Sequence, residues 1–403
     1  MKRISSLYLF FGAEIVIAAS MGINESIFNN FLSDTFELTA EARGALEFPR
    51  ELPGFLVVLF AGILGALSLP RMGALAALVF AAGTAGLGLA GNSYGLVVAS
   101  MLVSSVGMHL NQPISHSLTI AMSEDDRRGF RLGQLGGLRT FGTVLGTGLV
   151  WMTFRRDVPP YLSGFLYAAA GGVAAAILYA QLKVPGVHYR RSFFVIRRKF
   201  RLYYVLEFLF GARKQIFITF GPWVLIHVYG LSPGNIAFLL MLASIIGLVF
   251  KPLAGWVMDA WGERLVMVGD GLVLTLVCLG YGFAGSFPGG PKVALCIAGS
   301  CFILDNLLFA LSTGRTVYVS RLSSSPDELT GTLSLGVTMN HVASMVIPFW
   351  AGLMWKELGF QVVFASAGVL ALLLACFSWF VPGKRARAPI MGGDLYTTEG
   401  QAP

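Results

Sequence analysis

The sequence predicts an all-α membrane protein with twelve transmembrane helices, arranged as two pseudo-symmetric bundles of six. The first observation is composition: the 403-residue chain has 55% hydrophobic and only 12% charged residues, with a mean hydropathy of +0.72. Soluble proteins contain about a quarter charged residues. The second is the continuous apolar runs of about 20 residues or more, which exclude a membrane β-barrel because barrel strands alternate polar and apolar positions. The third is an internal repeat.

Apolar runs bounded by glycine, proline and charged residues define the helices in order. In the first half we expect them at 6–31, 40–69, 73–91, 94–121, 132–154 and 160–182, and in the second half at 202–228, 232–258, 264–284, 292–320, 329–355 and 358–381. Glu14 interrupts the first run, and the repeat requires this segment, so we expect a retained helix and not a cleaved signal peptide. The predicted organisation is an N-terminal bundle (1–182), a basic linker (183–201), a C-terminal bundle (202–382) and a disordered tail (383–403).

The repeat relates the two predicted bundles. LFFGAE, which ends at Glu14, matches FLFGAR, which ends at Arg213. Thr39 and Ser232 occupy matching positions as N-caps of the second and eighth helices, and Pro233 is the first residue of the eighth helix. Transporter folds are commonly built from such repeats, with the binding site between them near the middle of the membrane.

The linker contains seven basic residues and no acidic residue between Lys183 and Arg201. Basic residues also gather in alternate loops, so the positive-inside rule predicts cytoplasmic termini and a cytoplasmic linker. The net charge of +8 is therefore a topology signal and not a nucleic-acid footprint. Between its basic clusters, residues 193–196 suggest a short amphipathic element on the anionic bilayer surface. Short loops and the absence of a plausible exposed glycosylation site suggest a bacterial inner membrane, and we expect a monomer.

The loop after the eighth predicted helix contains Gly255, Asp259, Gly262 and Arg264 in a GxxxDxxGxR pattern. This pattern, with the six-plus-six topology, resembles the cytoplasmic loop signature of the major facilitator superfamily (MFS) of secondary transporters. The resemblance implies that the glycines allow close helix packing and that Asp259 acts as a latch at a helix N-terminus or an arginine. In the first-half copy Ala66 replaces the acid.

Gly133, Gly142 and Gly146 in the fifth predicted helix have the spacing of the family's antiporter signature, but Thr147 replaces its proline. Packing of helices through small residues explains these glycines equally well.

Four charged residues lie on one stripe of the second predicted helix, and the matching positions of the eighth helix are apolar or small. Charges at the centre of a spanning helix cost about 2.5–3.5 kcal/mol each, so these must be paired or face water. Two interpretations remain open, a structural network near the outer surface or a cavity and gate. We assign Arg43 and Glu47 to a gate, in which Glu25 pairs with Arg43, and Arg50 and Glu51 to the cavity.

Polar residues on other helices complete the predicted substrate and coupling cavity. Two histidines on one stripe of the fourth helix suit proton coupling; they are alternatively core histidines or, without an apparent third ligand, a metal pair. Intramembrane cations either bind an anionic group or pair with Glu14, Glu207 or Asp305. We expect Glu207, Lys251 and Arg315 at the membrane interface. The remaining cavity residues are Glu14, Glu25, His109, Gln112, His116, Arg139, Arg213, Lys214, Asp305 and Asn340.

No nucleophile motif, phosphate loop or paired-cysteine zinc pattern is apparent, so we expect no catalytic residues, metal or cofactor. The predicted function is a secondary transporter that moves a small polar solute, anionic or zwitterionic, by proton-coupled alternating access. An efflux antiporter for amphipathic compounds is the alternative within transport, and a transporter-like membrane sensor is the alternative from another class.

Overall fold

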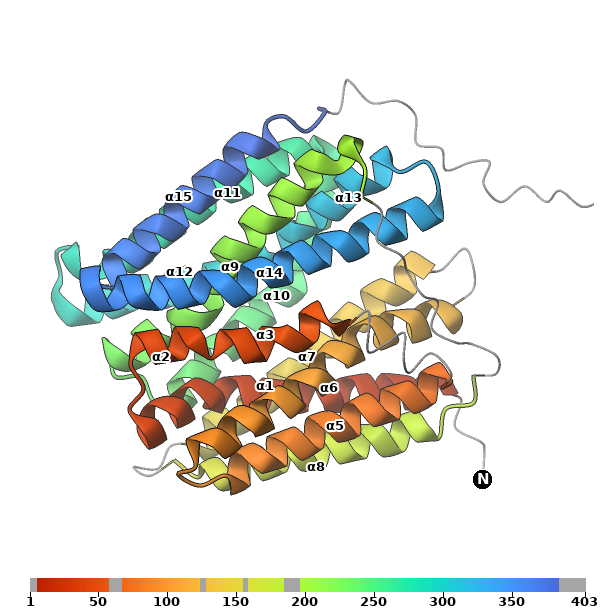
Figure 1. Cartoon of the computed structure of the whole chain (residues 1–403), viewed down its shortest axis with the longest axis horizontal. Helices are drawn as coiled ribbons and strands as arrows, with labels where there is room; N and C mark the ends of the chain where they lie inside the picture. Colours follow the sequence, from red (N-terminus) through yellow and green to blue (C-terminus); the bar gives the residue numbers. More distant parts are fainter. Residues whose placement is uncertain (1–5, 58–66, 124–127, 155–158, 185–195, 384–403) are drawn as a thin grey trace, which may run out of the picture.

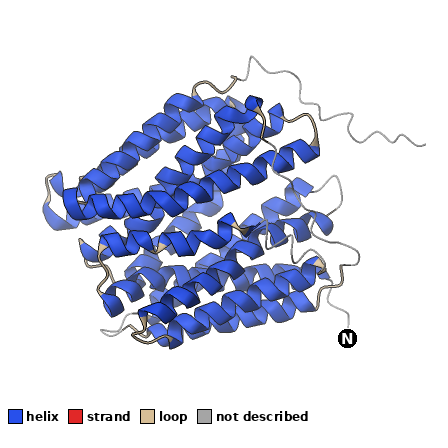
Figure 2. Cartoon of the chain, in the orientation of Figure 1, coloured by secondary structure: helices blue, strands red, loops and turns tan. Residues whose placement is uncertain are grey.

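The computed structural model describes residues 6–57, 67–123, 128–154, 159–184 and 196–383. All its regular elements in these ranges are helices (Figure 2). Those of the first half are α1 (Ser6–Phe36), α2 (Ala40–Ala45), α3 (Glu47–Phe55), α5 (Leu69–Leu89), α6 (Tyr94–Ala121), α7 (Arg128–Thr153) and α8 (Tyr161–Ala180). The second half has α9 (Arg201–His227), α10 (Pro233–Trp261), α11 (Glu263–Gly282), α12 (Gly290–Leu308), α13 (Thr313–Leu322), α14 (Pro326–Leu358) and α15 (Phe360–Ser378).

These elements account for the twelve predicted segments, which confirms the fold class. The second segment is divided into α2 and α3, and the tenth is divided into α12 and α13 by the short helix η5 (Phe309–Ser312). The predicted caps are confirmed as well: the Thr39 hydroxyl accepts a hydrogen bond from the amide of Ala42 at 3.2 Å, and that of Ser232 accepts one from Asn235 at 3.4 Å. Pro233 begins α10.

Nine helices in the described ranges are long and apolar enough to span a membrane. The segments outside this set are α2 with α3, α7 and α9, and each contains intramembrane cations, such as Arg50, Arg139 and Arg213. Because charged side chains are costly in lipid, these helices depend on contacts with neighbouring helices to span the membrane.

Helices α1 to α8 pack mainly against one another, as do α9 to α15, and the two halves lie side by side (Figure 1). They meet where α2 and α3 pack on α14 and where α7 packs on α10. The first contact is close because it uses glycine: a Cβ on Gly44 would lie 2.2 Å from the Pro348 carbonyl oxygen, and one on Gly352 would lie 2.7 Å from that of Ala40.

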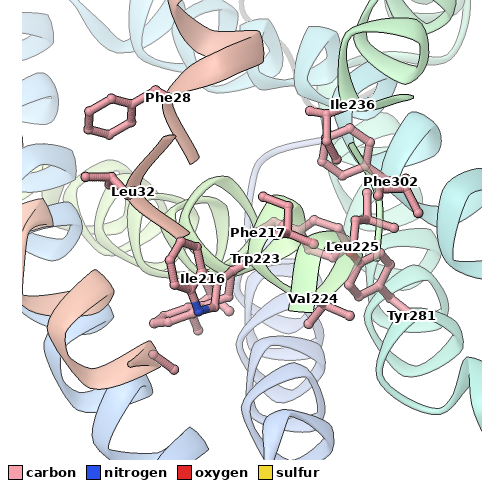
Figure 3. Close-up of a cluster of buried hydrophobic side chains, with 14 of the residues drawn as sticks. Phe28, Leu32, Ile216, Phe217, Trp223, Val224, Leu225, Ile236, Tyr281 and Phe302 are labelled. Carbon is pink, nitrogen blue, oxygen red and sulfur yellow. The ribbon is translucent and has the colours of Figure 1, made fainter. Parts of the chain in front are cut away.

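A large apolar cluster surrounds α9 near this interface. Phe217, Trp223 and Val224 of α9 pack with Tyr281 of α11 and Phe302 of α12, all of them buried (Figure 3). Because α9 is buried along most of its length, its polar residues have fixed neighbours on both sides of the interface.

The linker prediction falls mainly on residues 185–195, and the proposed amphipathic residues 193–195 also lie outside the described ranges, as does the tail beyond residue 383. At the described ends of the linker, Lys183 and Ser6 exchange hydrogen bonds between main chain and hydroxyl. Arg197 and Lys199 both pair with Glu328 at 2.7 Å. The linker thus contacts the first half through α1 and the second half through α14.

Candidate functional site

A cavity of about 400 Å³ lies between the two halves. Glu25 of α1 and Arg50 of α3 line it from the first half, and Lys251 and Asp305 line it from the second. A neighbouring cavity of about 270 Å³ shares Glu25 and Lys251 and extends between α7 and α10. The first cavity has charged side chains from both halves in a wall that is otherwise mainly apolar, formed by Phe217, Ile218, Ile236, Phe302 and Phe309.

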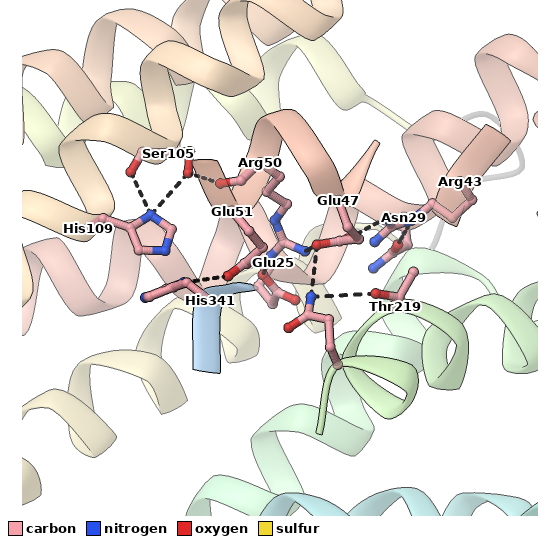
Figure 4. A network of polar contacts seen from close by, with 11 residues as sticks. Glu25, Asn29, Arg43, Glu47, Arg50, Glu51, Ser105, His109, Thr219 and His341 are labelled. Atoms are coloured by element: carbon pink, nitrogen blue, oxygen red, sulfur yellow. Dashed lines mark hydrogen bonds and ion pairs between the residues drawn. The ribbon is translucent and has the colours of Figure 1, made fainter. Parts of the chain in front are cut away.

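The charged stripe of α2 and α3 forms a network at the wall of this cavity (Figure 4). The Arg43 guanidinium is fully buried; it pairs with Glu47 and donates to the Asn29 side chain at 2.9 Å. Glu47, also fully buried, accepts from Arg50 at 3.1 Å and from Gln215 of α9 at 2.8 Å. The network therefore joins α1 and α3 to the second half, and every carboxylate oxygen of Glu47 has a donor.

The predicted Glu25–Arg43 pair is wrong. Glu25 pairs with Arg50 at 3.2 Å, and its side chain is 40% exposed. Arg43 lies on the short helix α2, before the break at Leu46, and it turns toward Asn29, one turn further along α1. Arg43 stays on the charged stripe, because it pairs with Glu47 four residues further on. Arg50, three residues beyond Glu47, is the arginine that reaches Glu25.

A second polar cluster lies where α3 and α6 meet α14. Glu51 accepts a hydrogen bond from His341 at 2.9 Å, and the His109 ring lies edge-on to the His341 ring with centroids 5.1 Å apart. Gly54 permits this contact, because a Cβ there would lie 2.3 Å from His341 and 2.6 Å from His109. The sequence placed these residues on three separate helices, and the fold brings them together.

Two further ion pairs neutralise the repeated positions at the ends of LFFGAE and FLFGAR. Glu14, fully buried, pairs with Arg139 at 2.9 Å and accepts from the Tyr179 hydroxyl at 2.6 Å. Arg213, also fully buried, pairs with Asp305. The repeat thus keeps a buried charge at this position and reverses its sign, with a partner inside the same half.

Two lysines, unlike these arginines, donate to neutral side chains. Lys214 donates to Asn340 of α14 at 2.8 Å. Lys251 was expected to extend to the membrane interface, but it lines the cavity and donates to the Thr140 hydroxyl of α7 at 2.9 Å.

Glu207 and Arg315, also expected at the interface, are buried and pair at 2.9 Å. They therefore form a structural link between α9 and α13, below the cavity-lining part of α9.

Gln112 and His116 are exposed on α6, on a different face from the buried Asn111 and Ser115. Asn111 accepts from Arg139 at 3.2 Å. The polar face of α6 that meets a charged partner is therefore the one with Asn111 and Ser115, whereas the predicted face was the one with Gln112 and His116. Asp270 of α11, 4% exposed, was missed too. In both cases a polar side chain within an apolar run was the available signal.

The four residues of the GxxxDxxGxR pattern lie in different environments. Gly262 ends α10 with a φ of +88°, and Arg264 stacks on the Trp379 ring at 4.1 Å. Asp259 is exposed at the end of α10, and a Cβ on Gly255 would meet nothing within 4 Å. Ala66, which replaces the acid in the first-half copy, lies outside the described residues.

Glycines of α7 serve close packing. A Cβ on Gly142 would lie 2.3 Å from the Ile15 carbonyl oxygen, and one on Gly146 would lie 2.0 Å from that of Ala19. Of the two interpretations of the partial antiporter signature, helix packing has direct support at these two positions. A Cβ on Gly133 would meet nothing within 4 Å in the part of the chain that the structure describes.

An all-helical membrane protein with charged side chains in a cavity between its halves has the architecture expected of a solute transporter. The family model for the Major Facilitator Superfamily matches residues 10–324 and 204–390. The chain therefore belongs to the major facilitator superfamily and is a multi-pass secondary transporter.

Solved structures share the fold at low sequence identity. The nucleoside transporter NupG is similar with a TM-score of 0.72 and 14% identity, over 93% of this chain and 98% of that one. A D-xylose-proton symporter gives 0.69 and 16%, over 95% and 98%. A POT family transporter gives 0.75 and 13%, over 92% and 94%. A comparison with curated proteins gave no match.

Proposed function

We propose that this transporter moves a small polar solute with an anionic group, an organic anion or a zwitterion, and that protons drive it. The observation that carries the proposal is the cavity between the halves, which has Glu25 and Arg50 on one wall and Lys251 and Asp305 on the other. A volume of about 400 Å³ suits a small metabolite. Charges of both signs disfavour a purely apolar cargo.

Lys251 is our candidate for the anion-binding group. Arg50, Arg139 and Arg213 each have a carboxylate partner. Among the described residues, Lys251 has only the neutral Thr140 hydroxyl. An ammonium group whose charge is not already neutralised gains most from an anionic ligand. Asn306 lies beside it in the cavity, with its amide nitrogen bonded to the Phe302 carbonyl at 2.8 Å, which leaves its carbonyl oxygen as an acceptor.

Glu25 and Asp305 are our candidates for proton binding, because both line the cavity and both hold an arginine of their own half. Protonation of either carboxylate would release its arginine and change the charge of the cavity. A D-xylose-proton symporter and the E. coli fucose:proton symporter share the fold, which supports proton coupling here.

Alternating access would use the residues 1–182 and 202–382 as two moving halves. The contacts of α2 and α3 with α14 close the end of the bundle where α2 begins and α14 ends, opposite the start of α1 and the end of α15 (Figure 1). We assign Arg43 and Glu47 to this gate and Asp259 to the opposite end. The positive-inside pattern supports cytoplasmic termini.

The experiment is uptake into proteoliposomes under an imposed pH gradient, against panels of anionic, zwitterionic and neutral metabolites. We expect accumulation of an anionic or zwitterionic solute that collapses with the gradient. Lys251→Met should raise the KM for that solute more than tenfold, whereas Lys292→Met, a matched change at the exposed start of α12, should leave it unchanged.

Glu25→Gln and Asp305→Asn test the coupling separately. At least one of them should retain counterflow, which needs no net proton movement, and lose accumulation driven by the gradient. Full proton-driven accumulation by both variants would refute the assignment of these carboxylates. Transport of amphipathic cations in place of polar anions would favour the efflux alternative.

A further inference from the structure

We propose that Glu51, His109 and His341 form a binding site for a divalent transition-metal ion of the zinc type, held between the two halves of the transporter. One potential ligand atom from each residue lies within 4.8 Å of the others. Glu51 comes from α3 and His109 from α6, whereas His341 comes from α14 in the second half. This inference rests on the geometry of the cluster and does not depend on the transported solute.

The set of donors selects the kind of ion. Two imidazoles and one carboxylate are the ligands of open zinc sites, in which water or a further ligand takes the fourth position. Imidazole nitrogen favours Zn²⁺, Cu²⁺ or Ni²⁺ over Mg²⁺ and Ca²⁺, which prefer oxygen ligands. The site would therefore discriminate against the abundant alkaline-earth ions.

The hydrogen bonds of the His109 ring orient it to act as a metal ligand. Its Nδ1 lies 2.9 Å from the main-chain carbonyl oxygen of Ser105 and 3.0 Å from the Ser105 hydroxyl (Figure 4). The carbonyl can only accept, so this contact selects the tautomer with the proton on Nδ1 and leaves the lone pair on Nε2. A histidine ligand that donates its other nitrogen to a backbone carbonyl is the usual arrangement at metal sites.

The cluster is compact enough to close on an ion through side-chain rotation. Metal–ligand distances of 2.0–2.1 Å place tetrahedral ligands about 3.4 Å apart. The His341 Nδ1 and the Glu51 carboxylate are 2.9 Å apart, so they would have to separate slightly, and the Nδ1 proton of His341 would be lost to solvent when the ion binds. Gly54 gives both rings the space to approach, because no Cβ lies between them. With all ligand atoms within 4.8 Å of one another, these adjustments are small.

The charged groups around the cluster determine how tightly it should bind the metal ion. Arg50 is paired with Glu25 and Glu47, so it opposes a cation only weakly. Lys214 attracts Glu51 and hydrogen bonds to the neutral Asn340, so its ammonium is the main repulsive charge near the site. Replacing it with methionine should therefore strengthen metal binding.

The test is calorimetric titration of Zn²⁺ into the purified full-length protein at pH 7.5. We expect one site, which His109→Ala and His341→Ala each weaken by more than ~100-fold, because the loss of even an outer-shell partner costs 10–100-fold. His116→Ala is the matched control, since His116 is on the same helix but exposed, and it should bind Zn²⁺ as the wild type does. Mg²⁺ should give no binding.

A second readout guards against variants that fold poorly. Zn²⁺ should raise the thermal unfolding temperature of the wild type and of His341→Cys, which retains a zinc ligand, but not that of His341→Ala. Lys214→Met should increase the affinity. The proposal is overturned if the wild type does not bind Zn²⁺, or if both alanine variants of the cluster bind it as tightly as the wild type.

Discussion

Replacing Glu47 with glutamine tests whether the buried charge network on α3 stabilises the contact between the halves. Glu47 is fully buried and accepts from Arg43, Arg50 and Gln215. A glutamine side chain at this position would keep the shape but remove the charge. Arg43, itself fully buried and with one guanidinium nitrogen already lacking a partner among the described residues, would keep only neutral acceptors, such as Asn29.

The expected magnitude follows from this burial. Removing one partner of a buried ion pair costs about 3–5 kcal/mol, because the remaining charge has neither water nor a counterion. Arg50 retains Glu25, so the cost arises almost entirely at Arg43. The measurement is the denaturation midpoint of the purified protein in detergent, followed by intrinsic tryptophan fluorescence.

The matched control is Glu41→Gln. Glu41 on α2 pairs with Lys356 on α14 at 2.9 Å, so it also joins the halves, but its side chain is 35% exposed and that of Lys356 is 57% exposed. Exposed ion pairs contribute little to stability, so this variant should unfold close to the wild type. Equal destabilisation by the two substitutions would refute the argument that burial makes Glu47 important.

Two further substitutions test packing and the repeated buried charge. Gly44→Ala places a Cβ 2.2 Å from the Pro348 carbonyl oxygen and should separate α2 from α14, with a lower unfolding temperature and slower transport; Gly136→Ala, where nothing lies within 4 Å, should be neutral in both assays. Arg139→Gln leaves Glu14 buried without its counterion and should cost about 3–5 kcal/mol, measured as a shift in the denaturation midpoint. Adding Glu14→Gln to this variant should recover a large part of the loss, and no recovery would contradict the pairing.

The sequence by itself predicted the number of helical segments and their order along the chain. Insertion of an apolar segment into a bilayer and the capping of its ends depend on residues close together in the chain. The twelve segments, the caps at Thr39 and Ser232 and the repeat were therefore predictable, as was the family. Intramembrane charges also identified most of the candidate site, because an unpaired charge in lipid is too costly to be incidental.

Only the tertiary structure decided which of these side chains meet. In the folded chain Glu25 meets Arg50, and Arg43 meets Asn29, one turn further along α1. His341 reaches Glu51 across 290 positions in the chain, and no local pattern could have paired them. Partner choice between distant helices depends on their crossing and rotation, which are set by the packing of many neighbours, such as Gly44 on Pro348. Hydropathy and periodicity give the position of each polar residue along its helix, but contacts between helices determine its partner.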